Sequence, residues 1–403
     1  MLLLYIDPGT GSLLFSVLIG LSTAFYFLFR KFIIKLKIFF SPNTNKLLKY
    51  YNYVIYNEGD QYWPVFEPIL EEFENRRIDV SYLTSSLNDE AFKNNYSFIH
   101  PEYIGVGNKV FSILNMLETD ICLMTTPGLD VYQLKRSKLC KHYSHILHDT
   151  GDATCYKLFG LDWFDSVLLS GEYQINDIRE LENIRKTDNK NLFVVGSTYL
   201  DYYSKKINFL KITKNHVFTV LVSPSWGQGS LLNLIGERLL ENLSNTGWCI
   251  IVRPHPQSKK SEPDLLKKLE EKFSYFTWDY NSENLDSLSK ADIMISDFSG
   301  IIFDYIFLFN KPVLYNNSKF FKQMYDAGDI DHELWKFEII RKIAIELSLD
   351  DIDNITETIK NVISITCFAE ERRKAKETAW QNFGQSGITV VNTLVNIRNS
   401  FYN

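Results

Sequence analysis

Short runs rich in β-branched and aromatic residues alternate with helical stretches along most of this chain. Helical stretches of about ten or more residues, including 229–243, 263–273 and 300–309, separate most of these runs. Such alternation is typical of parallel sheets with helices on both faces, so it predicts an α/β fold. The predicted strands are 51–56, 78–84, 120–125, 144–148, 166–169, 192–196, 217–222, 248–252, 275–278, 292–296 and 312–315.

The length of 403 residues and the two series of strands favour two Rossmann-like domains that face each other across a cleft. We place the first domain at 46–205 and the second at 215–368, with a Lys- and Asn-rich hinge near 200–215. The tail, 369–403, is predicted to form a long helix, a break at 384–387 and a second helix.

Charge and cysteine usage exclude some classes of protein. The formal net charge of -6 argues against nucleic acid as the main partner, because such binding relies on clustered Lys and Arg. The five cysteines are odd in number and include no C-x-x-C pair, so a zinc ribbon and a disulfide framework are poorly supported. We interpret them as buried thiols in a reducing compartment.

Residues 8–29 carry no charge and are mostly Leu, Phe, Ile and Val. A helix of that length spans about 33 Å, enough to cross a hydrocarbon core of about 30 Å. Arg30, Lys31, Lys35 and Lys37 follow at once, which predicts that the rest of the chain faces the cytoplasm. A cleaved signal peptide is the alternative, but residues 1–12 contain no Lys or Arg and no A-x-A site follows.

We therefore predict that 1–40 is a single-pass anchor in the cell's cytoplasmic (inner) membrane, with a basic segment beside it. Residues 31–40 mix lysines with apolar residues, which fits a helix along an anionic leaflet. A helix that simply continues out of the membrane fits equally well.

In open parallel sheets, ligands bind beyond the carboxyl ends of the strands. After the strand at 248–252 come Arg253, Pro254, His255 and Pro256. Arg253 is a planar cation suited to phosphate, and His255 can donate a hydrogen bond or exchange a proton. The prolines would hold both side chains in place. The alternative is a stiff loop with exposed polar groups.

The strand at 292–296 ends at Ser296, and Asp297, Phe298, Ser299 and Gly300 lead into a helix. Ser and Gly at a helix start direct backbone N–H groups toward an anion. Asp297 could hold a hydroxyl of the ligand or orient a donor, or it could only cap the helix.

The loop 223–230, which includes Ser225 and Gly227, is a Gly-rich strand-to-helix turn that would let a ligand approach the backbone. It matches neither a Walker loop nor a full G-x-G-x-x-G, so a plain turn is an equal alternative.

In the first half, His148 ends a predicted strand and enters a glycine turn, where it is a natural general base facing the cleft. Asp149 or Asp152 could orient it. A buried structural histidine is the alternative. His142, His145 and His148 also invite a metal hypothesis, but alternate residues of a strand point to opposite faces, so three ligands would not converge easily. The two D-x-D strings, at 329–331 and 351–353, are better interpreted as solvated helix starts.

These motifs together resemble the CDP-glycerol:poly(glycerophosphate) glycerophosphotransferases of teichoic acid synthesis. The resemblance covers about 140–320 and rests on R-P-H-P at 253–256, on S-D-F-S-G-I-I-F-D-Y at 296–305, on K-P at 311–312, and on His148 at the place of the family's H-G-T-P histidine. It implies a GT-B fold, a CDP-glycerol-like donor and no catalytic metal or other cofactor. His148 would deprotonate the acceptor hydroxyl. The donor's pyrophosphate would be held, and the departing CMP stabilised, by Arg253, His255, Ser296 and Ser299.

The sequence departs from the family pattern at two places. The family's H-G-T-P is here H-D-T-G, and Gly300 stands where the family has a second serine, which removes a hydroxyl donor. Both departures bear on the substrate more than on the fold.

We therefore expect a membrane-anchored transferase that moves glycerol phosphate, or a similar polyol phosphate, from a CDP donor to a lipid-linked glycan or polymer acceptor of the cell envelope. One alternative is a GT-B glycosyltransferase that uses a nucleotide sugar. Another is a degenerate scaffold without activity, which the intact His148, R-P-H-P and S-D-x-S-G motifs argue against.

Overall fold

The computed structural model describes residues 16–23, 25, 29, 50–209, 217–318, 320–365 and 368–402. Residues Met1–Tyr50 and Tyr51–Asn403 form two separate compact units. In the first unit, residues 16–23 are helical. Across the described ranges, no helix combines the length and the apolar character that a membrane crossing requires. The predicted membrane segment, 8–29, lies only partly within those ranges and stays a prediction.

The second unit begins with a sheet of seven parallel strands in the order β3-β2-β1-β4-β5-β6-β7. Residues 51–209 and the last helix, α16 (Ser386–Asn399), are called the front lobe below. Its strands are β1 (Tyr51–Asn57), β2 (Val80–Thr84), β3 (Ile99–Tyr103), β4 (Thr119–Met124), β5 (Cys140–Ile146), β6 (Ser166–Leu169) and β7 (Asn191–Val194).

A second parallel sheet has six strands in the order β10-β9-β8-β11-β12-β13. We call the described part of 217–379 the rear lobe. Its strands are β8 (Thr219–Val222), β9 (Cys249–Val252), β10 (Thr277–Trp278), β11 (Ile293–Ser296), β12 (Val313–Tyr315) and β13 (Ile345–Glu346).

Helices connect the strands in both lobes, as parallel pairing requires. Those of the front lobe are η1 (Asp60–Tyr62), α3 (Trp63–Asn75), η2 (Glu90–Lys93), α4 (Asn108–Leu114), η3 (Ala153–Cys155), α5 (Tyr173–Arg185) and α6 (Thr198–Phe209). Those of the rear lobe are α7 (Leu231–Ser244), α8 (Ser258–Ser261), α9 (Pro263–Lys272), α10 (Leu285–Lys290), α11 (Ile301–Phe309), η4 (Lys322–Met324), η5 (Asp326–Asp329), α12 (Trp335–Ile343), α13 (Leu349–Asp353), α14 (Ile355–Ile363) and α15 (Ala369–Ala379).

Each sheet buries its own apolar core. In the front lobe, α3 presents Phe66, Ile69, Leu70 and Phe73 to the sheet, at the three- and four-residue spacing of one helix face. Pro64 occupies its first turn, where the missing N–H costs nothing. In the rear lobe, α7 and α14 cover one face of the sheet, and α11 is buried with the residues of the other face.

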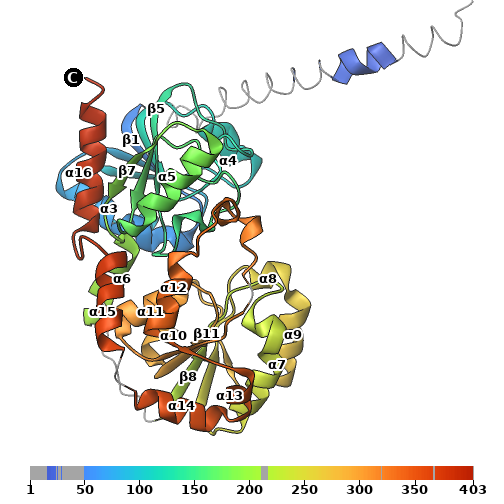
Figure 1. Cartoon of the computed structure of the whole chain (residues 1–403). Coiled ribbons are helices and arrows are strands. Elements are labelled where there is room, and N and C mark those ends of the chain that lie inside the picture. Colours follow the sequence, from blue (N-terminus) through green and yellow to red (C-terminus); the bar gives the residue numbers. More distant parts are fainter. Residues whose placement is uncertain are drawn as a thin grey trace, which may run out of the picture. The chain divides into compact units, whose positions relative to one another are not determined.

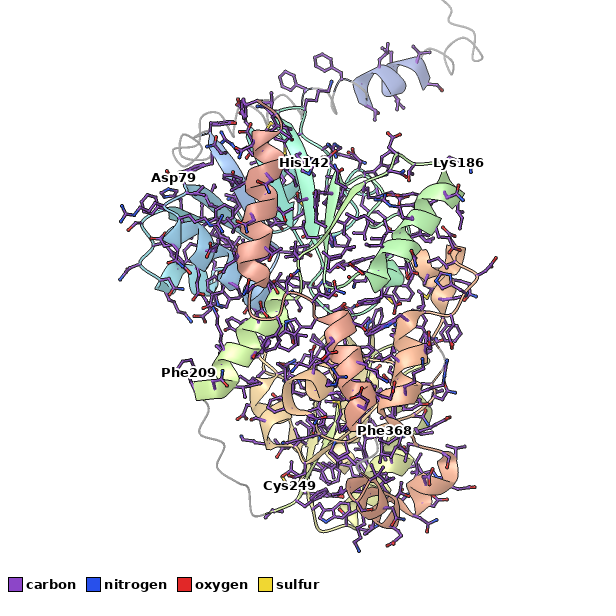
Figure 2. All side chains as sticks on the ribbon, turned by 60° about the vertical axis from the view of Figure 1, so that its left-hand side comes forward. Asp79, His142, Lys186, Phe209, Cys249 and Phe368 are labelled. Carbon is purple, nitrogen blue, oxygen red and sulfur yellow. The ribbon has the colours of Figure 1, made fainter. Side chains whose placement is uncertain are left out.

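The chain's last segment joins the two lobes. Helix α15 packs on α11 and α12 in the rear lobe, whereas α16 packs on α3 and α6 in the front lobe (Figure 1). Figure 2 shows the same two helices following each other across both lobes. Between them, the carboxylate of Asp201 on α6 accepts hydrogen bonds from Trp380 Nε1 and from the backbone N–H groups of Gly384 and Ser386, each at 2.8 Å. These bonds explain the predicted break in the tail, which the structure places between Ala379 and Ser386.

Polar contacts also hold the lobes together. The Arg185 guanidinium of α5 lies 2.7 Å from both Asp326 and Asp329 of the rear lobe. Asp326 in turn accepts from the backbone N–H of Phe159 at 2.6 Å. Because the lobes form one compact unit, the boundaries predicted for separate domains stay a prediction.

Candidate active site

A cleft of about 270 Å³ lies between the lobes, at the carboxyl ends of the strands of both sheets. Its lining includes six of the residues singled out in the sequence: His148, Asp149, Arg253, His255, Ser299 and Gly300. Across the cleft, Asp149 Oδ2 lies 4.0 Å from the point that a Cβ on Gly300 would occupy. The turn after β5 and the start of α11 therefore meet at one site.

His148 stands two residues beyond the end of β5, and its side chain is 32% exposed. Its Nδ1 lies 3.1 Å from the hydroxyl of Tyr156, and the ring of Tyr62 meets it edge-on. Its Nε2 is 3.9 Å from Asp149 Oδ2, beyond hydrogen-bonding distance. The imidazole is thus anchored through Nδ1, while Nε2 is the nitrogen left for chemistry.

The hydroxyl of Tyr156 joins His148 to a second histidine, because it also lies 3.2 Å from His145 Nε2. Burial lowers the pKa of His145 to about 3, with His148 as a smaller cause, so that ring stays neutral. Burial also raises the pKa of Tyr156 well above its usual value, so its oxygen keeps its proton. When this phenol donates to His145, its oxygen accepts from Nδ1–H of His148, and Nε2 of His148 is left with the lone pair of a base.

The three histidines of β5 and the following turn do not share one partner. His142 Nε2 lies 2.9 Å from Ser166 Oγ, whereas His145 and His148 both face Tyr156. Within the described residues, no three His, Cys, Asp or Glu side chains come together in a way that could hold a metal ion. The geometry gives no support to a metal site at these histidines.

The sequence suggested that Asp149 or Asp152 could orient His148, but both carboxylates accept hydrogen bonds from backbone N–H groups instead. Asp149 accepts from the Gly151 N–H at 2.8 Å and shapes the turn. Asp152 is buried and accepts from the N–H groups of Trp335 and Lys336 at 2.8 and 3.1 Å, so it caps α12 of the other lobe. The idea that Asp152 orients His148 is therefore corrected to a structural role that joins the lobes.

Arg253 lines the cleft, but its guanidinium is engaged inside the protein. It is buried, with Nη1 2.5 Å from Asp279 Oδ2, and Nη2 donates to the carbonyl of Asn281 at 2.7 Å. The guanidinium of Arg253 thus holds the loop after β10 against the end of β9. This engagement indicates that Arg253 positions the loop, and its role as a cation that grips the donor phosphate stays a prediction.

His255 is held as a neutral hydrogen-bond donor. Its Nδ1 accepts from the Gln257 N–H at 3.1 Å, so the neutral ring carries its proton on Nε2. Burial lowers the pKa of His255 to about 4, although Glu262 opposes this shift. At neutral pH, Nε2–H can therefore donate to an anion in the cleft. The sequence left open that His255 exchanges a proton with the substrate. A pKa of about 4 does not suit His255 to act as a general acid at neutral pH.

Three other predicted donor-binding residues are used inside the rear lobe. Ser296 is fully buried and donates to the Ser223 carbonyl at 2.6 Å. Asp297 is buried too, and it accepts from the N–H groups of Ser225 and Leu231 at 2.8 and 2.9 Å. Neither Ser296, Asp297 nor Ser225 lines the cleft. In the structure they brace the loop after β8 against the loop after β11, and their contact with the donor stays a prediction.

The start of α11 is the candidate anion-binding element of the cleft. Ser299 and Gly300 precede this nine-residue helix, and both line the cavity. Free N–H groups and the helix dipole at such a start favour a phosphate. Gly227 lies outside the lining with its N–H donating to Glu262 at 3.1 Å, and its φ of +92° explains the glycine.

A buried carboxyl in the cleft was given no role from the sequence. Asp304, on the first turn of α11, accepts from the Tyr199 hydroxyl at 3.0 Å, and Asn284 Nδ2 donates to that same hydroxyl at 3.0 Å. Burial raises the pKa of Asp304 to about 7, against the effect of Tyr199. The signal was the position of Asp304 one helical turn after Gly300, which places both residues on one helix face.

Two facing parallel sheets, with a strand-end histidine and a helix start at the cleft between them, give a GT-B-like fold with a candidate site for a nucleotide-activated donor. A sequence profile of the family CDP-Glycerol:Poly(glycerophosphate) glycerophosphotransferase matches residues 182–327. This match confirms the family resemblance found in the motifs, and with it the prediction of a CDP-glycerol glycerophosphotransferase-like enzyme. No curated protein sequence matches the chain significantly.

Solved structures confirm the fold. The wall teichoic acid polymerase TagF, as a variant soaked with CDPG, aligns with a TM-score of 0.58 at 13% identity, over 93% of this chain and 98% of that chain. The UDP-GlcNAc 2-epimerase of Methanocaldococcus jannaschii, in complex with UDP-GlcNAc and UDP, aligns with a TM-score of 0.54 at 14% identity, over 85% of this chain and 99% of that chain. At such low identity the likeness concerns the fold alone.

Proposed function

We propose that this protein transfers glycerol phosphate from CDP-glycerol to a hydroxyl group of a membrane-linked glycan or polymer of the cell envelope. The observation that carries the proposal is the shared cleft, in which His148 faces the helix start at Ser299 and Gly300. The family match supports the donor and the type of transfer.

In this reaction, the acceptor hydroxyl attacks the phosphorus that carries glycerol. A new P–O bond forms, the P–O bond to the CMP phosphate breaks, and CMP leaves with the electron pair. His148 Nε2 takes the hydroxyl proton, since its ring is anchored through Nδ1 by Tyr156.

The donor's charge is met by neutral groups rather than by a free arginine. His255, Ser299 and Gly300 line the cleft that would hold the pyrophosphate, where Nε2–H of His255 and N–H groups at the start of α11 would donate to it. Positioned donors of this kind stabilise charge that develops on the leaving phosphate.

The proposal extends to the membrane. The uncharged segment 8–29, followed by Arg30, Lys31, Lys35 and Lys37, supports a single-pass anchor in the cytoplasmic membrane with the lobes in the cytoplasm. An anchored enzyme would meet a lipid-linked acceptor without diffusing through the cytosol.

The test is a comparison of nucleotide release. The full chain is incubated in detergent with membrane-extracted acceptor and either CDP-glycerol or a set of UDP-sugars. We expect CMP from CDP-glycerol, and about a hundredfold or greater loss with His148→Ala, because a positioned base contributes that much. His100→Ala removes an imidazole on β3 that does not line the cleft, and it should leave the rate unchanged. Release of UDP alone would replace the proposal with a nucleotide-sugar glycosyltransferase.

A further inference from the structure

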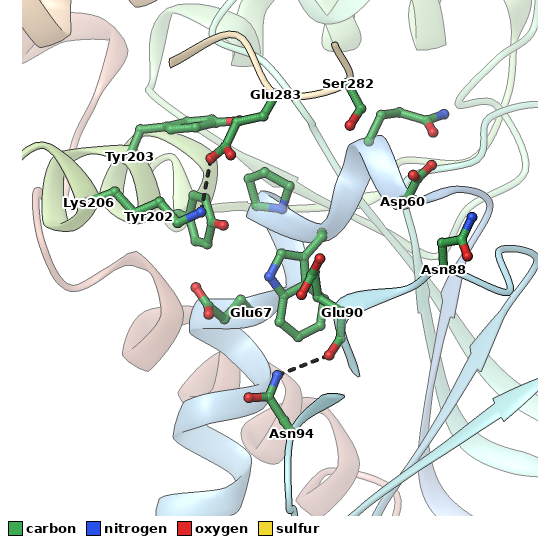
Figure 3. Close-up of a pocket in the computed structure, with 13 residues that line it drawn as sticks. Asp60, Glu67, Asn88, Glu90, Asn94, Tyr202, Tyr203, Lys206, Ser282 and Glu283 are labelled. Atoms are coloured by element: carbon green, nitrogen blue, oxygen red, sulfur yellow. Dashed lines mark hydrogen bonds and ion pairs between the residues drawn. The ribbon is translucent and has the colours of Figure 1, made fainter. Parts of the chain in front are cut away.

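A second cavity, of about 320 Å³, lies beside the active-site cleft. Gln61 of η1 and Ser282 of the loop after β10 line both cavities, so the two spaces adjoin. The rest of its lining comes from η1, α3, the η2 region, α6 and the loop after β10 (Figure 3). A molecule seated here could extend one end toward His148.

The lining of this second cavity is acidic. It contains four carboxyl side chains, Asp60, Glu67, Glu90 and Glu283. Of the described residues that line it, Lys206 alone is a cation, and Lys206 Nζ already lies 2.9 Å from Glu283 Oε1 (Figure 3). A chain of phosphodiesters would therefore meet like charge here without a cation ready to pair with it.

The same lining suits hydroxyl groups. Carboxylates accept hydrogen bonds from hydroxyls, and a protonated carboxyl can also donate one. Burial raises the pKa of Glu67 to about 7, with Glu71 adding to the shift, so both forms of this group are present near neutral pH. Trp63 and Tyr202 add aromatic surface to the wall, which can face the apolar parts of a sugar ring.

We propose that this cavity is the acceptor subsite and that it takes an uncharged, polyhydroxylated acceptor, such as the end of a neutral glycan. The inference rests on the proposed function and narrows its acceptor. The enzyme then places glycerol phosphate on a neutral glycan and does not extend an existing poly(glycerol phosphate) chain. A second transfer would be disfavoured, because the first product carries a phosphodiester into an acidic pocket.

The experiment uses acceptor probes that differ only in charge. Neutral alkyl-linked disaccharides are compared with the same molecules extended by three glycerol phosphate units, and CMP release from CDP-glycerol is measured with the full chain in detergent. We expect release with a neutral probe and at least tenfold less with its extended form. Equal or faster use of the extended form would overturn the proposal, and so would CDP-glycerol binding without transfer to any neutral probe. If CDP-glycerol neither binds nor reacts, the proposed function fails first and this inference falls with it.

A second arm maps the subsite. Asp60→Asn and Glu67→Gln should each raise the KM for the neutral acceptor at least fivefold, while the KM for CDP-glycerol stays the same. Glu72→Gln is the matched control, because Glu72 also lies on α3, carries the same charge, does not line the cavity and does not contribute to the pKa shift of Glu67. Unchanged acceptor KM in both pocket variants, or an equal change in the control, would contradict the assignment.

Discussion

Asp149 and Gly300 face each other across the cleft, with the Asp149 carboxylate 4.0 Å from where a Cβ on Gly300 would stand. One residue follows the candidate base, and the other begins the candidate phosphate-binding helix. Their approach brings the front-lobe motif and the rear-lobe motif into one site, as the mechanism requires.

The first prediction concerns Gly300→Ser, which restores the hydroxyl that the family pattern has at this position. Gly300 has helical φ and ψ of -60° and -20°, and its Cβ position meets nothing closer than Asp149, so a serine fits. We expect the free energy of unfolding to change by less than about 1 kcal/mol. The KM for CDP-glycerol should fall, because the helix start gains a donor. A large loss of stability would show that the cleft is tighter than the structure indicates.

The second prediction concerns Tyr156→Phe, which keeps the ring and removes the hydroxyl between His145 and His148. We expect kcat to fall by about tenfold or more with an unchanged KM for CDP-glycerol, because the base loses its orienting bond. Stability should fall by about 1 kcal/mol.

Tyr305→Phe is the control for this loss of a hydroxyl. Tyr305 is buried in the rear lobe and donates to the Ala291 carbonyl at 3.0 Å, outside the cleft lining. Tyr305→Phe should lower the free energy of unfolding by a similar amount and leave kcat unchanged. Equal kcat losses in the two variants would mean that Tyr156 acts only through folding.

The third prediction separates positioning from phosphate binding at Arg253. Since Arg253 and Asp279 form a buried ion pair, Arg253→Ala and Asp279→Ala should each destabilise the protein by about 3–5 kcal/mol. The double variant should cost much less than the sum of the two. Chemical denaturation measures all three. If Arg253→Ala leaves stability intact and abolishes CDP-glycerol binding, the arginine contacts the donor after all.

The sequence predicted the strands well because buried parallel strands are rich in β-branched and aromatic residues. Two strands were missed for physical reasons. β3 lies at the edge of its sheet and contains Pro101, which an edge strand tolerates. β13 has two residues, too few to show a pattern.

The location of the site could be predicted from the sequence, but the contacts that its residues make could not. Polar residues after strands were expected at the cleft, and His148, His255, Ser299 and Gly300 do line it. The directions of Arg253 and Asp297 were not readable, because they depend on partners distant in the sequence, Asp279 and Leu231. The bond from Tyr156 to His148 depends likewise on the turn between them.

The fourth prediction concerns pH. The pKa of Asp304, raised by burial to about 7, means that the native state keeps a proton that the unfolded chain releases near pH 4. Between these values the native state binds more protons, so this group lowers the free energy of unfolding as pH rises. Asp304→Asn removes that titration. The free energy of unfolding is measured by denaturation at about pH 5 and about pH 7. Between these two pH values it should fall by roughly 2 kcal/mol less in the variant than in the wild type. Parallel pH profiles would contradict the assignment.

The most direct measurement of the central claim is a crystal structure of the chain with CDP-glycerol. We expect the pyrophosphate at the start of α11, within hydrogen-bonding distance of His255 Nε2, and the glycerol-bearing phosphorus on the side of His148. Donor density outside this cleft, or with His148 turned away from that phosphorus, would contradict the account.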